Sequence, residues 1–468
     1  MFSDPKSLYF VGAGGIGMAN LVRYFLARGA RVAGYDLTPS DLTRALEKEG
    51  ARITYADDAA TIPEEFRNQT ETLVVYTPAV PADNHILTYF RNGGFEVVKR
   101  AALLGRITRH SQSICVAGSH GKTTVSTMIA HILEGSEVKC NAFLGGIARN
   151  YNSNLLLNLR SPWSVIEADE YDRSFHQLLP RIAVVTSTDP DHLDIYGDEE
   201  GYLEGFAHFT SLIQPGGCLI AHTGLKLRPR LAEGVRLITY SGPEAEGEWH
   251  AENVRYDDGH LFFDIVHPEG RIADVELGVP IEINITNAVA AACASRIAGA
   301  NDDDIRLGLK TFLGAKRRFE IWELPDQNPR GVALIDDYAH SPHEVEASIR
   351  SVKKLFPGRE LTVVFQPHLY TRTRDFAPEF AEALSAADRV VLLQIYPARE
   401  KPIEGVTSKI IYDRLKCKKR VLIEREDLVN YIKNSNFEIL MTLGAANLDV
   451  LLPEIHAALT GCDSEKCD

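Results

Sequence analysis

The stretch Ile114-Cys-Val-Ala-Gly-Ser-His-Gly-Lys-Thr-Thr124 decides how the rest of the chain is interpreted. Its apolar start, residues 114–117, predicts a buried strand, and the apolar residues between 125 and 133 recur at the spacing of one helical face. A strand, a glycine-bearing turn, Lys-Thr and a helix are the layout of a phosphate-binding loop. The strict motif has a glycine where Val116 stands, so this is a variant loop. A Gly-Lys-Thr that merely opens a helix is the alternative.

The composition describes an ordinary globular protein. At 468 residues the chain has room for about three domains. A hydrophobic content of 45% with 24% charged residues is typical of well-packed cores. The net charge of −14 argues against a nucleic-acid partner, because phosphate neutralisation needs a basic surface.

The seven cysteines are scattered, and no two form a Cys-x-x-Cys pair, which favours reduced thiols over a disulfide framework or a zinc site. The first ten residues are too polar for a signal peptide, and no apolar run approaches 18 residues. We therefore expect a cytoplasmic protein with no membrane partner.

A second glycine-rich turn stands near the start of the chain. Gly12, Gly14 and Gly17 follow a short apolar run and form a Gly-x-Gly-x-x-Gly dinucleotide fingerprint, with Asp36 about 20 residues on. This pattern is typical of NAD binding, but the same turn can hold the diphosphate of any nucleotide, including a UDP-sugar. Asp36 contacts a ribose in the first interpretation; alternatively it caps a turn at the end of its strand.

The strand predicted over 72–76 ends at Thr77-Pro-Ala-Val80, where open parallel sheets bind ligands. We end this first α/β domain at residue 107.

Polar residues also follow the predicted strands of the middle region. Val165-Ile-Glu-Ala-Asp-Glu170 ends in carboxylates, and Asp189-Pro-Asp-His-Leu-Asp194 follows the strand predicted over 182–186. Carboxylates past strand ends suit Mg²⁺-nucleotide chemistry. His192 is a less usual magnesium ligand and could instead cap its turn with Asp189 or Asp194. Asn284 and Asn287 stand at an alanine-rich helix predicted over 285–298, where both could be helix caps.

A segment with a different residue pattern begins near Gly314. A basic segment, Ala315-Lys-Arg-Arg-Phe319, precedes strands that alternate with helices, which predicts a third, mostly parallel sheet. Polar clusters follow three of these strands, at 336–342, 366–374 and 396–400.

Taken together and in order, these motifs resemble the Mur ligases, the ATP-dependent amide-forming enzymes of peptidoglycan precursor synthesis. The motifs that carry the resemblance are Gly-Gly-Ile-Gly-Met, Gly-Ser-His-Gly-Lys-Thr-Thr, Glu-Ala-Asp-Glu, Asp-His-Leu-Asp, Asn-x-x-Asn, Arg-Arg-Phe, Asp-Asp-Tyr-x-His and Phe-Gln-Pro-His. The resemblance covers nearly the whole chain. It implies an α/β fold of three domains: a Rossmann-like UDP-sugar-binding domain at 1–107, a P-loop-type central ATPase domain at 108–315 and a Rossmann-like amino-acid-binding domain at 316–468.

The resemblance also implies roles for individual residues. The residues implied to bind the UDP-sugar are Gly14, Gly15, Thr77, Pro78 and Ala79. The residues implied to bind ATP are Gly118, Ser119, His120, Gly121, Lys122, Thr123, Thr124, Asn284, Asn287, Arg318 and Asp337. The implied Mg²⁺ ligands are Thr123, Glu167 and His192, so for His192 the resemblance favours a metal ligand over a turn cap. The catalytic residues are Lys122, His340 and Arg372, the last two also binding the incoming amino acid.

The implied cofactors are ATP and Mg²⁺, and the implied substrates are UDP-N-acetylmuramate and L-alanine, joined through an acyl phosphate by a monomer or homodimer. Two positions depart from the family pattern: Ile283 stands where a histidine is usual, and Leu369 where an arginine is usual. Within the family, a recycling ligase that attaches a preformed peptide to the same UDP-sugar is the alternative. An NAD-dependent oxidoreductase and a non-catalytic nucleotide-binding regulator are the alternatives outside it.

Overall fold

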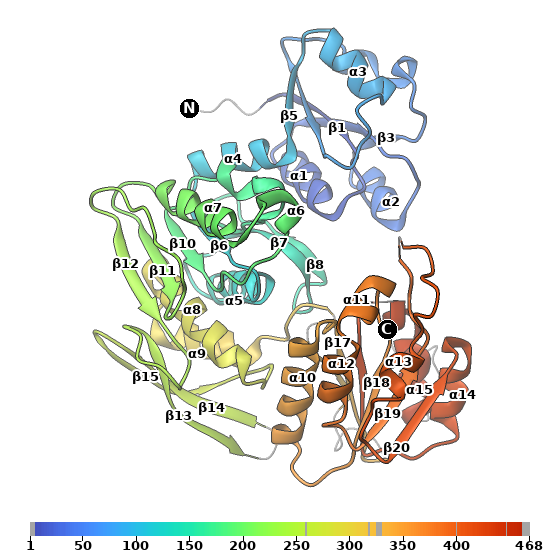
Figure 1. Cartoon of the computed structure of the whole chain (residues 1–468). Coiled ribbons are helices and arrows are strands. Elements are labelled where there is room, and N and C mark those ends of the chain that lie inside the picture. Colours follow the sequence, from blue (N-terminus) through green and yellow to red (C-terminus); the bar gives the residue numbers. More distant parts are fainter. Residues whose placement is uncertain are drawn as a thin grey trace. The chain divides into compact units, whose positions relative to one another are not determined.

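The computed structural model describes residues 5–257, 260–316, 319–323, 330–398, 400–445 and 447–460. The described chain forms four sheets and packs into two compact units (Figure 1). The first unit comprises Met1–Glu252, Ile265–Ala273 and Thr286–Leu309, and the second comprises Asn253–Asp264, Asp274–Ile285 and Lys310–Asp468. The predicted α/β class with parallel sheets is confirmed. The predicted domain boundaries at 107/108 and 315/316 stay predictions.

The N-terminal sheet is parallel, with the strand order β3-β2-β1-β4-β5. Its strands are β1 (Ser7–Val11), β2 (Arg31–Tyr35), β3 (Arg52–Thr54), β4 (Thr72–Tyr76) and β5 (Glu96–Lys99). Its helices are α1 (Ile16–Ala27), α2 (Asp41–Lys48), η1 (Ala59–Thr61), η2 (Glu64–Phe66), α3 (His85–Asn92) and α4 (Arg100–His110). The chain connections run outward in opposite directions from β1 and β4, and in open parallel sheets ligands bind at the carboxyl ends of such a strand pair. Both predicted UDP-sugar segments, after β1 and after β4, are there.

The central sheet has seven strands in the order β12-β11-β10-β6-β9-β7-β8. Its strands are β6 (Gln112–Ala117), β7 (Asn141–Ala148), β8 (Ser153–Leu156), β9 (Trp163–Glu167), β10 (Ile182–Val185), β11 (Cys218–His222) and β12 (Arg236–Tyr240). Its helices are α5 (Lys122–Gly135), η3 (Tyr171–Gln177), α6 (Leu193–Tyr196) and α7 (Glu199–Ser211). The strand β6 lies between β9 and β10 and is parallel to both. The three polar segments that follow these strands therefore emerge side by side at one edge.

The sequence did not predict β7 and β8, which pair antiparallel at the edge of this sheet. Two consecutive glycines, Gly145 and Gly146, interrupt the apolar pattern of β7. Glycine disfavours isolated strands, so only pairing with β9 and β8 explains this strand.

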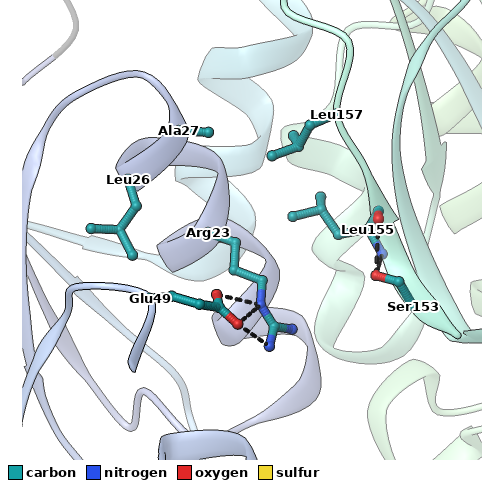
Figure 2. Close-up of a pocket in the computed structure, with 7 residues that line it drawn as sticks. All are labelled: Arg23, Leu26, Ala27, Glu49, Ser153, Leu155 and Leu157. Atoms are coloured by element: carbon teal, nitrogen blue, oxygen red, sulfur yellow. Dashed lines mark hydrogen bonds and ion pairs between the residues drawn. The ribbon is translucent and has the colours of Figure 1, made fainter. Parts of the chain in front are cut away.

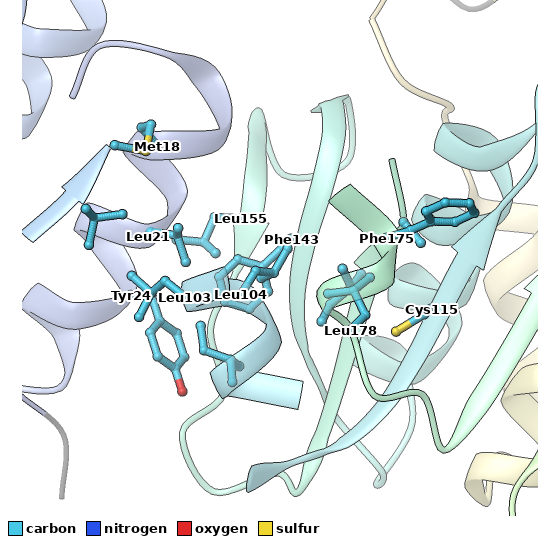
Figure 3. Close-up of a cluster of buried hydrophobic side chains, with 14 of the residues drawn as sticks. Met18, Leu21, Tyr24, Leu103, Leu104, Cys115, Phe143, Leu155, Phe175 and Leu178 are labelled. Carbon is cyan, nitrogen blue, oxygen red and sulfur yellow. The ribbon is translucent and has the colours of Figure 1, made fainter. Parts of the chain in front are cut away.

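One hydrophobic cluster holds the N-terminal and central sheets together in the first unit (Figure 3). Leu103 and Leu104 of α4 pack in this cluster with Met18 and Leu21 of α1. The same cluster includes Phe143 and Leu155 of the central sheet, and Phe175 and Leu178 in and after η3. Helix α4 therefore packs through its apolar residues against elements of both sheets.

A small sheet, β13-β14-β15, and two helices follow the central sheet. These elements are β13 (His250–Asp257), β14 (His260–His267), β15 (Gly270–Glu276), α8 (Ile283–Ala298) and α9 (Asp302–Thr311).

The C-terminal sheet has the order β16-β17-β21-β18-β19-β20, with β16 antiparallel at one edge and the other strands parallel. Its strands are β16 (Glu320–Glu323), β17 (Ala333–Asp337), β18 (Leu361–Phe365), β19 (Arg389–Leu393), β20 (Lys419–Ile423) and β21 (Ile439–Leu443). Its helices are α10 (Pro342–Leu355), α11 (Tyr370–Asp375), α12 (Ala377–Leu384), α13 (Lys409–Tyr412), η5 (Arg425–Asp427), α14 (Leu428–Lys433), η6 (Asn447–Leu451) and α15 (Leu452–Thr460). The last strand, β21, is inserted between β17 and β18, so the first two predicted polar clusters are separated by one strand.

In the part of the chain that the structure describes, no helix has the length and apolar character needed to cross a membrane.

Candidate active site

The turn between β6 and α5 requires glycine at two positions. Gly118 has φ of +142° and Gly121 has φ of +81°, values that side-chain-bearing residues rarely adopt. A Cβ on Gly118 would also lie 2.1 Å from Oγ1 of Thr186. Ser119 is half-buried and His120 is exposed, so the predicted phosphate loop is open at its tip. Thr124 is half-buried in the first turn of α5, which starts at Lys122.

The lysine of this turn is held by a buried carboxylate. The Nζ of Lys122 donates to the carbonyl of Gly118 at 2.5 Å and lies 2.9 and 2.8 Å from the two carboxylate oxygens of Glu170. The Glu170 side chain is 2% exposed. A buried carboxylate is costly unless it is paired, so Lys122 and Glu170 hold each other in place. Glu170 was part of the quoted carboxylate run, but the sequence did not single it out.

Glu167 ends β9 beside the start of α5. Burial raises the pKa of the Glu167 carboxyl, while a hydrogen bond from Thr123, the charge of Lys122 and the backbone N–H of Gly145 act in the opposite direction. That N–H lies 3.1 Å from Oε2 of Glu167. A Cβ at position 145 would lie 2.1 Å from Oε1, so the glycine in β7 leaves the space that the carboxylate occupies.

His192 lies near Glu170, the carboxylate that holds Lys122. Its Nε2 is 3.9 Å from Oε1 of Glu170 and 3.8 Å from Oδ2 of Asp191, and its ring meets Tyr171 edge to face. The turn is tight, since His192 has φ of +51°. The ring that approaches Asp189, at 3.8 Å, belongs instead to His120.

Two of the predicted metal ligands, Glu167 and Thr123, lie together in a way that is compatible with magnesium. Among the described residues no three His, Cys, Asp or Glu side chains form a metal-binding group. Magnesium needs fewer, because it keeps water molecules and takes further oxygens from nucleotide phosphates. The Glu167 carboxylate, disfavoured by burial and hydrogen-bonded to the Thr123 hydroxyl, is a partly compensated anion that a cation would stabilise.

The two asparagines lie within α8, which begins at Ile283. Asn284 is the second residue of the helix and Asn287 the fifth, so neither occupies the N-cap position and the helix-cap interpretation is wrong. The Asn284 amide donates to the carbonyl of Val279 at 3.2 Å. Asn287 faces the phosphate turn, since its Oδ1 would lie 3.0 Å from a Cβ on Gly121.

The N-terminal glycine turn is closed by a carboxylate of its own. The backbone N–H of Gly14 donates to Oδ2 of Asp36 at 2.6 Å, so Asp36 caps the turn. A Cβ on Gly12 would lie 2.6 Å from Cγ2 of Thr77, which places the segment after β4 directly against the turn. Gly15 is exposed at the tip of the turn. Pro78 and Ala79 are exposed as well.

The C-terminal polar clusters include a cation with unused donor capacity. The Nη1 atom of Arg372, on α11, is buried with no hydrogen-bond partner among the described residues. After β19, Glu400 accepts the backbone N–H of Thr371 at 3.0 Å. His340 lies after β17, with its Nδ1 3.4 Å from Oε2 of Glu344. Arg372 and His340 both belong to the second unit.

Asp337, Arg318 and the departure at Leu369 belong to the same part of the chain. Asp337 is buried at the end of β17, where it accepts from the backbone N–H of Phe319 at 3.2 Å and from the Ser348 hydroxyl. Arg318 lies outside the described residues. Leu369 has φ of +71° immediately before α11, and its N–H donates to the carbonyl of Tyr396 at 3.0 Å.

A pocket of about 510 Å³ lies elsewhere in the first unit, between α1 and β8 (Figure 2). A two-pronged ion pair between Arg23 and Glu49 lines one side, and Leu155 and Leu157 line the other. None of the predicted site residues lines this pocket, so it is separate from the candidate active site.

Three family models match successive parts of the chain. Residues 7–112 match the Mur ligase family catalytic domain, residues 116–295 the Mur ligase middle domain, and residues 317–443 the glutamate ligase domain of Mur ligases. The chain belongs to the Mur ligase family. The family predicted from the sequence motifs is thereby confirmed.

Relatives of this Mur ligase align over nearly their full length. A UDP-N-acetylmuramate–L-alanine ligase from Parabacteroides distasonis is 55% identical over 97% of each chain. A protein of the same name from Phocaeicola vulgatus is 52% identical over 97% of this chain and 98% of its own. The crystal structure of a UDP-N-acetylmuramate-alanine ligase from Thermotoga maritima superposes with a TM-score of 0.76 at 25% identity, over 97% of this chain and 98% of that one.

Proposed function

We propose that this Mur ligase joins L-alanine to the lactyl carboxylate of UDP-N-acetylmuramate, with conversion of ATP to ADP and phosphate, as a step in peptidoglycan precursor synthesis. The observation that carries the proposal is that ligases of this name align with 97% of the chain at more than half identity. The geometry supports a nucleotide-dependent reaction, because Lys122, Thr123 and Glu167 meet at the ends of neighbouring strands.

The reaction needs the substrate carboxylate to be activated. A carboxylate is a poor electrophile, since its leaving group would be oxide. Transfer of the γ-phosphoryl group of ATP gives an acyl phosphate, and attack by the alanine amine then releases phosphate. Phosphoryl transfer depends mainly on positioning and on charge stabilisation.

In this proposal the turn between β6 and α5 provides both the positioning and the charge stabilisation. Backbone N–H groups of the loop at 118–124 and the Lys122 ammonium bind the β- and γ-phosphates of ATP. Asn287, beside Gly121, contacts the same nucleotide. Thr123, Glu167 and His192 would hold Mg²⁺, which when bound neutralises charge on the phosphate oxygens. Glu170 keeps the Lys122 ammonium directed along the turn.

The other two modules bind the partners to be joined. In this proposal Gly14, Gly15 and residues 77–79 bind the UDP-sugar at the carboxyl ends of β1 and β4. The carboxylate of alanine pairs with Arg372, whose buried Nη1 has unused donor capacity. His340 accepts a proton from the alanine ammonium, because only the neutral amine attacks. The boundaries at 107/108 and 315/316 separate these modules.

Phosphate release by the purified protein tests the reaction. With ATP, Mg²⁺ and UDP-N-acetylmuramate present, we expect release that depends on L-alanine and is much slower with glycine or serine. Faster release with a preformed tripeptide than with L-alanine would favour the recycling ligase. Consumption of a nicotinamide cofactor without phosphate release would contradict both.

The amino-acid site has a separate test. We expect Arg372→Ala to raise the KM for L-alanine by roughly 10- to 100-fold, because a charged hydrogen bond to the carboxylate is lost. The KM for the UDP-sugar is expected to change little. Equal increases in both constants would remove Arg372 from the amino-acid site.

A further inference from the structure

The third glycine of the N-terminal turn lies against an arginine from another helix. A Cβ on Gly17 would lie 2.7 Å from Nη1 of Arg100 and 3.3 Å from its Cζ. In the usual fingerprint, this glycine allows close packing of helix on strand. In this protein its missing side chain leaves room for a guanidinium at the start of α1. A cation therefore reaches a turn whose own residues, 12–17, carry none.

The charge of this guanidinium is only partly balanced within the protein. Its nearest acidic group is Asp169, with Nη2 3.9 Å from Oδ2, which is beyond hydrogen-bond distance. Within the residues that the structure describes, the guanidinium has no hydrogen-bond acceptor, and the side chain is 28% exposed. Its chain neighbour Lys99, in contrast, is paired with Asp172 at 3.0 Å. Arg100 thus retains donors for a further anion.

Local electrostatics do not explain an arginine at this position. Arg100 is the first residue of α4, Lys99 precedes it, and no acidic residue occupies the first turn of the helix. The positive end of the helix dipole disfavours cations there. An anion bound nearby would reverse this unfavourable arrangement. At the turn itself, Asp36 already occupies the N–H of Gly14 and adds negative charge, so an anionic ligand needs a compensating cation.

The core holds Arg100 in position. Leu103 and Leu104, on the next turn of α4, are 0% and 8% exposed and belong to the cluster that includes Met18 and Leu21 of α1 (Figure 3). The helix that carries the arginine is thus packed against the helix that begins at the glycine turn. A guanidinium carried on such a fixed helix loses less freedom when it binds a ligand.

We propose that Arg100 binds the diphosphate of the UDP-sugar at the N-terminal glycine turn. The planar guanidinium pairs with two phosphate oxygens, which a lysine cannot do in the same geometry. Residues at the start of α1 offer backbone N–H groups that have no acceptor within the helix. The inference rests on the proposed function for the identity of the nucleotide sugar, and it adds a residue that the motif does not contain.

Binding measurements on the full chain test this role. The ligands are UDP, UDP-N-acetylglucosamine, which lacks the lactyl carboxylate, and UDP-N-acetylmuramate. We expect Arg100→Ala to weaken all three by a similar factor of roughly 10 to 100, as for loss of a charged hydrogen bond to phosphate. Arg100→Lys should restore part of the affinity. Arg109→Ala, on an exposed position of the same helix, is the matched control and should bind all three normally.

The possible results distinguish a contact between Arg100 and the diphosphate from other causes of weaker binding. A loss confined to UDP-N-acetylmuramate would assign Arg100 to the lactyl carboxylate and overturn the diphosphate contact. Unchanged affinity for UDP would overturn it as well. An equal loss of ATP affinity, which is measured at the other turn, would indicate a structural role only. A wild-type protein that binds UDP but does not release phosphate with L-alanine would contradict the proposed function and leave the Arg100 contact intact.

Discussion

The molecule contains two glycine turns, and each connects a buried strand to the start of a helix. The two turns differ in where their positive charge comes from. The central turn carries its cation within the motif, as Lys122, and a buried carboxylate on the neighbouring strand end holds that cation. The N-terminal turn carries no cation. Its motif is closed by the carboxylate of Asp36, and the nearest guanidinium, that of Arg100, comes from a different helix.

This difference shows how the same local geometry is adapted to two anions. A turn that assists phosphoryl transfer needs a cation whose position relative to the nucleotide is tightly controlled, which the Lys122–Glu170 pair provides. A turn that only binds a diphosphate needs charge balance, which a side chain from the surrounding core can supply. Four experiments test this contrast.

The largest effect is expected from Lys122→Ala, which should lower turnover by about 10³-fold or more, because the charge opposite the transferred phosphoryl group is lost. It also leaves Glu170 buried and unpaired, so we expect a loss of stability of about 3 kcal/mol. The double variant Lys122→Ala/Glu170→Gln should regain stability without regaining activity. Phosphate release and thermal unfolding measure the two properties. Near-normal turnover in either variant would remove the central turn from the mechanism.

Gly145→Ala should have the next largest effect. The added methyl group competes for the space of the Glu167 carboxylate, so we expect turnover to fall by roughly 10- to 100-fold, with a higher requirement for Mg²⁺. Gly135→Ala is the matched control, because a Cβ at Gly135 meets nothing within 4 Å. Magnesium titrations of phosphate release measure both. Identical magnesium curves for the two variants would show that Glu167 does not serve the metal.

At the N-terminal turn the informative pair is Gly17→Ala and Gly15→Ala. The first must displace the end of the flexible Arg100 side chain, so UDP should bind roughly 10-fold more weakly with little loss of stability. The second places a Cβ at ordinary contact distances, 3.9 and 4.0 Å, and should change UDP affinity less. Calorimetric titration with UDP gives both values. A larger effect at position 15 would indicate that the backbone, not Arg100, dominates binding.

The smallest effect concerns stability against pH. Burial raises the pKa of Glu167, so folding disfavours its ionised form relative to the unfolded chain. This carboxyl therefore lowers the stability of the fold as pH rises above its unfolded pKa of about 4.3. In metal-free buffer, Glu167→Gln should unfold at a higher temperature than the wild type at pH 7, and the difference should shrink towards pH 4. Thermal unfolding over that range tests it. A variant less stable than the wild type at pH 7 would contradict the direction.

Much of the fold and the family could be predicted from the sequence. The strand at 361–365 and the helix after Lys122 follow from apolar periodicity, and the family follows from motifs in order. The unresolved choices concerned side chains with two plausible partners. Asp36 could contact a ribose or cap a turn, and only the folded chain shows its carboxylate on the N–H of Gly14.

The sequence by itself determined where strands end and which polar residues follow them, because those features depend on local patterns of apolar and turn residues. It therefore placed Lys122, Glu167 and His192 just after predicted strands, while their proposed roles come from the family resemblance. Only the tertiary structure decided that Glu170 faces Lys122, that Gly145 makes room for Glu167 and that Arg100 reaches Gly17. Each of these contacts joins residues far apart in the chain, so it depends on strand order and on core packing, which leave no local pattern in the sequence.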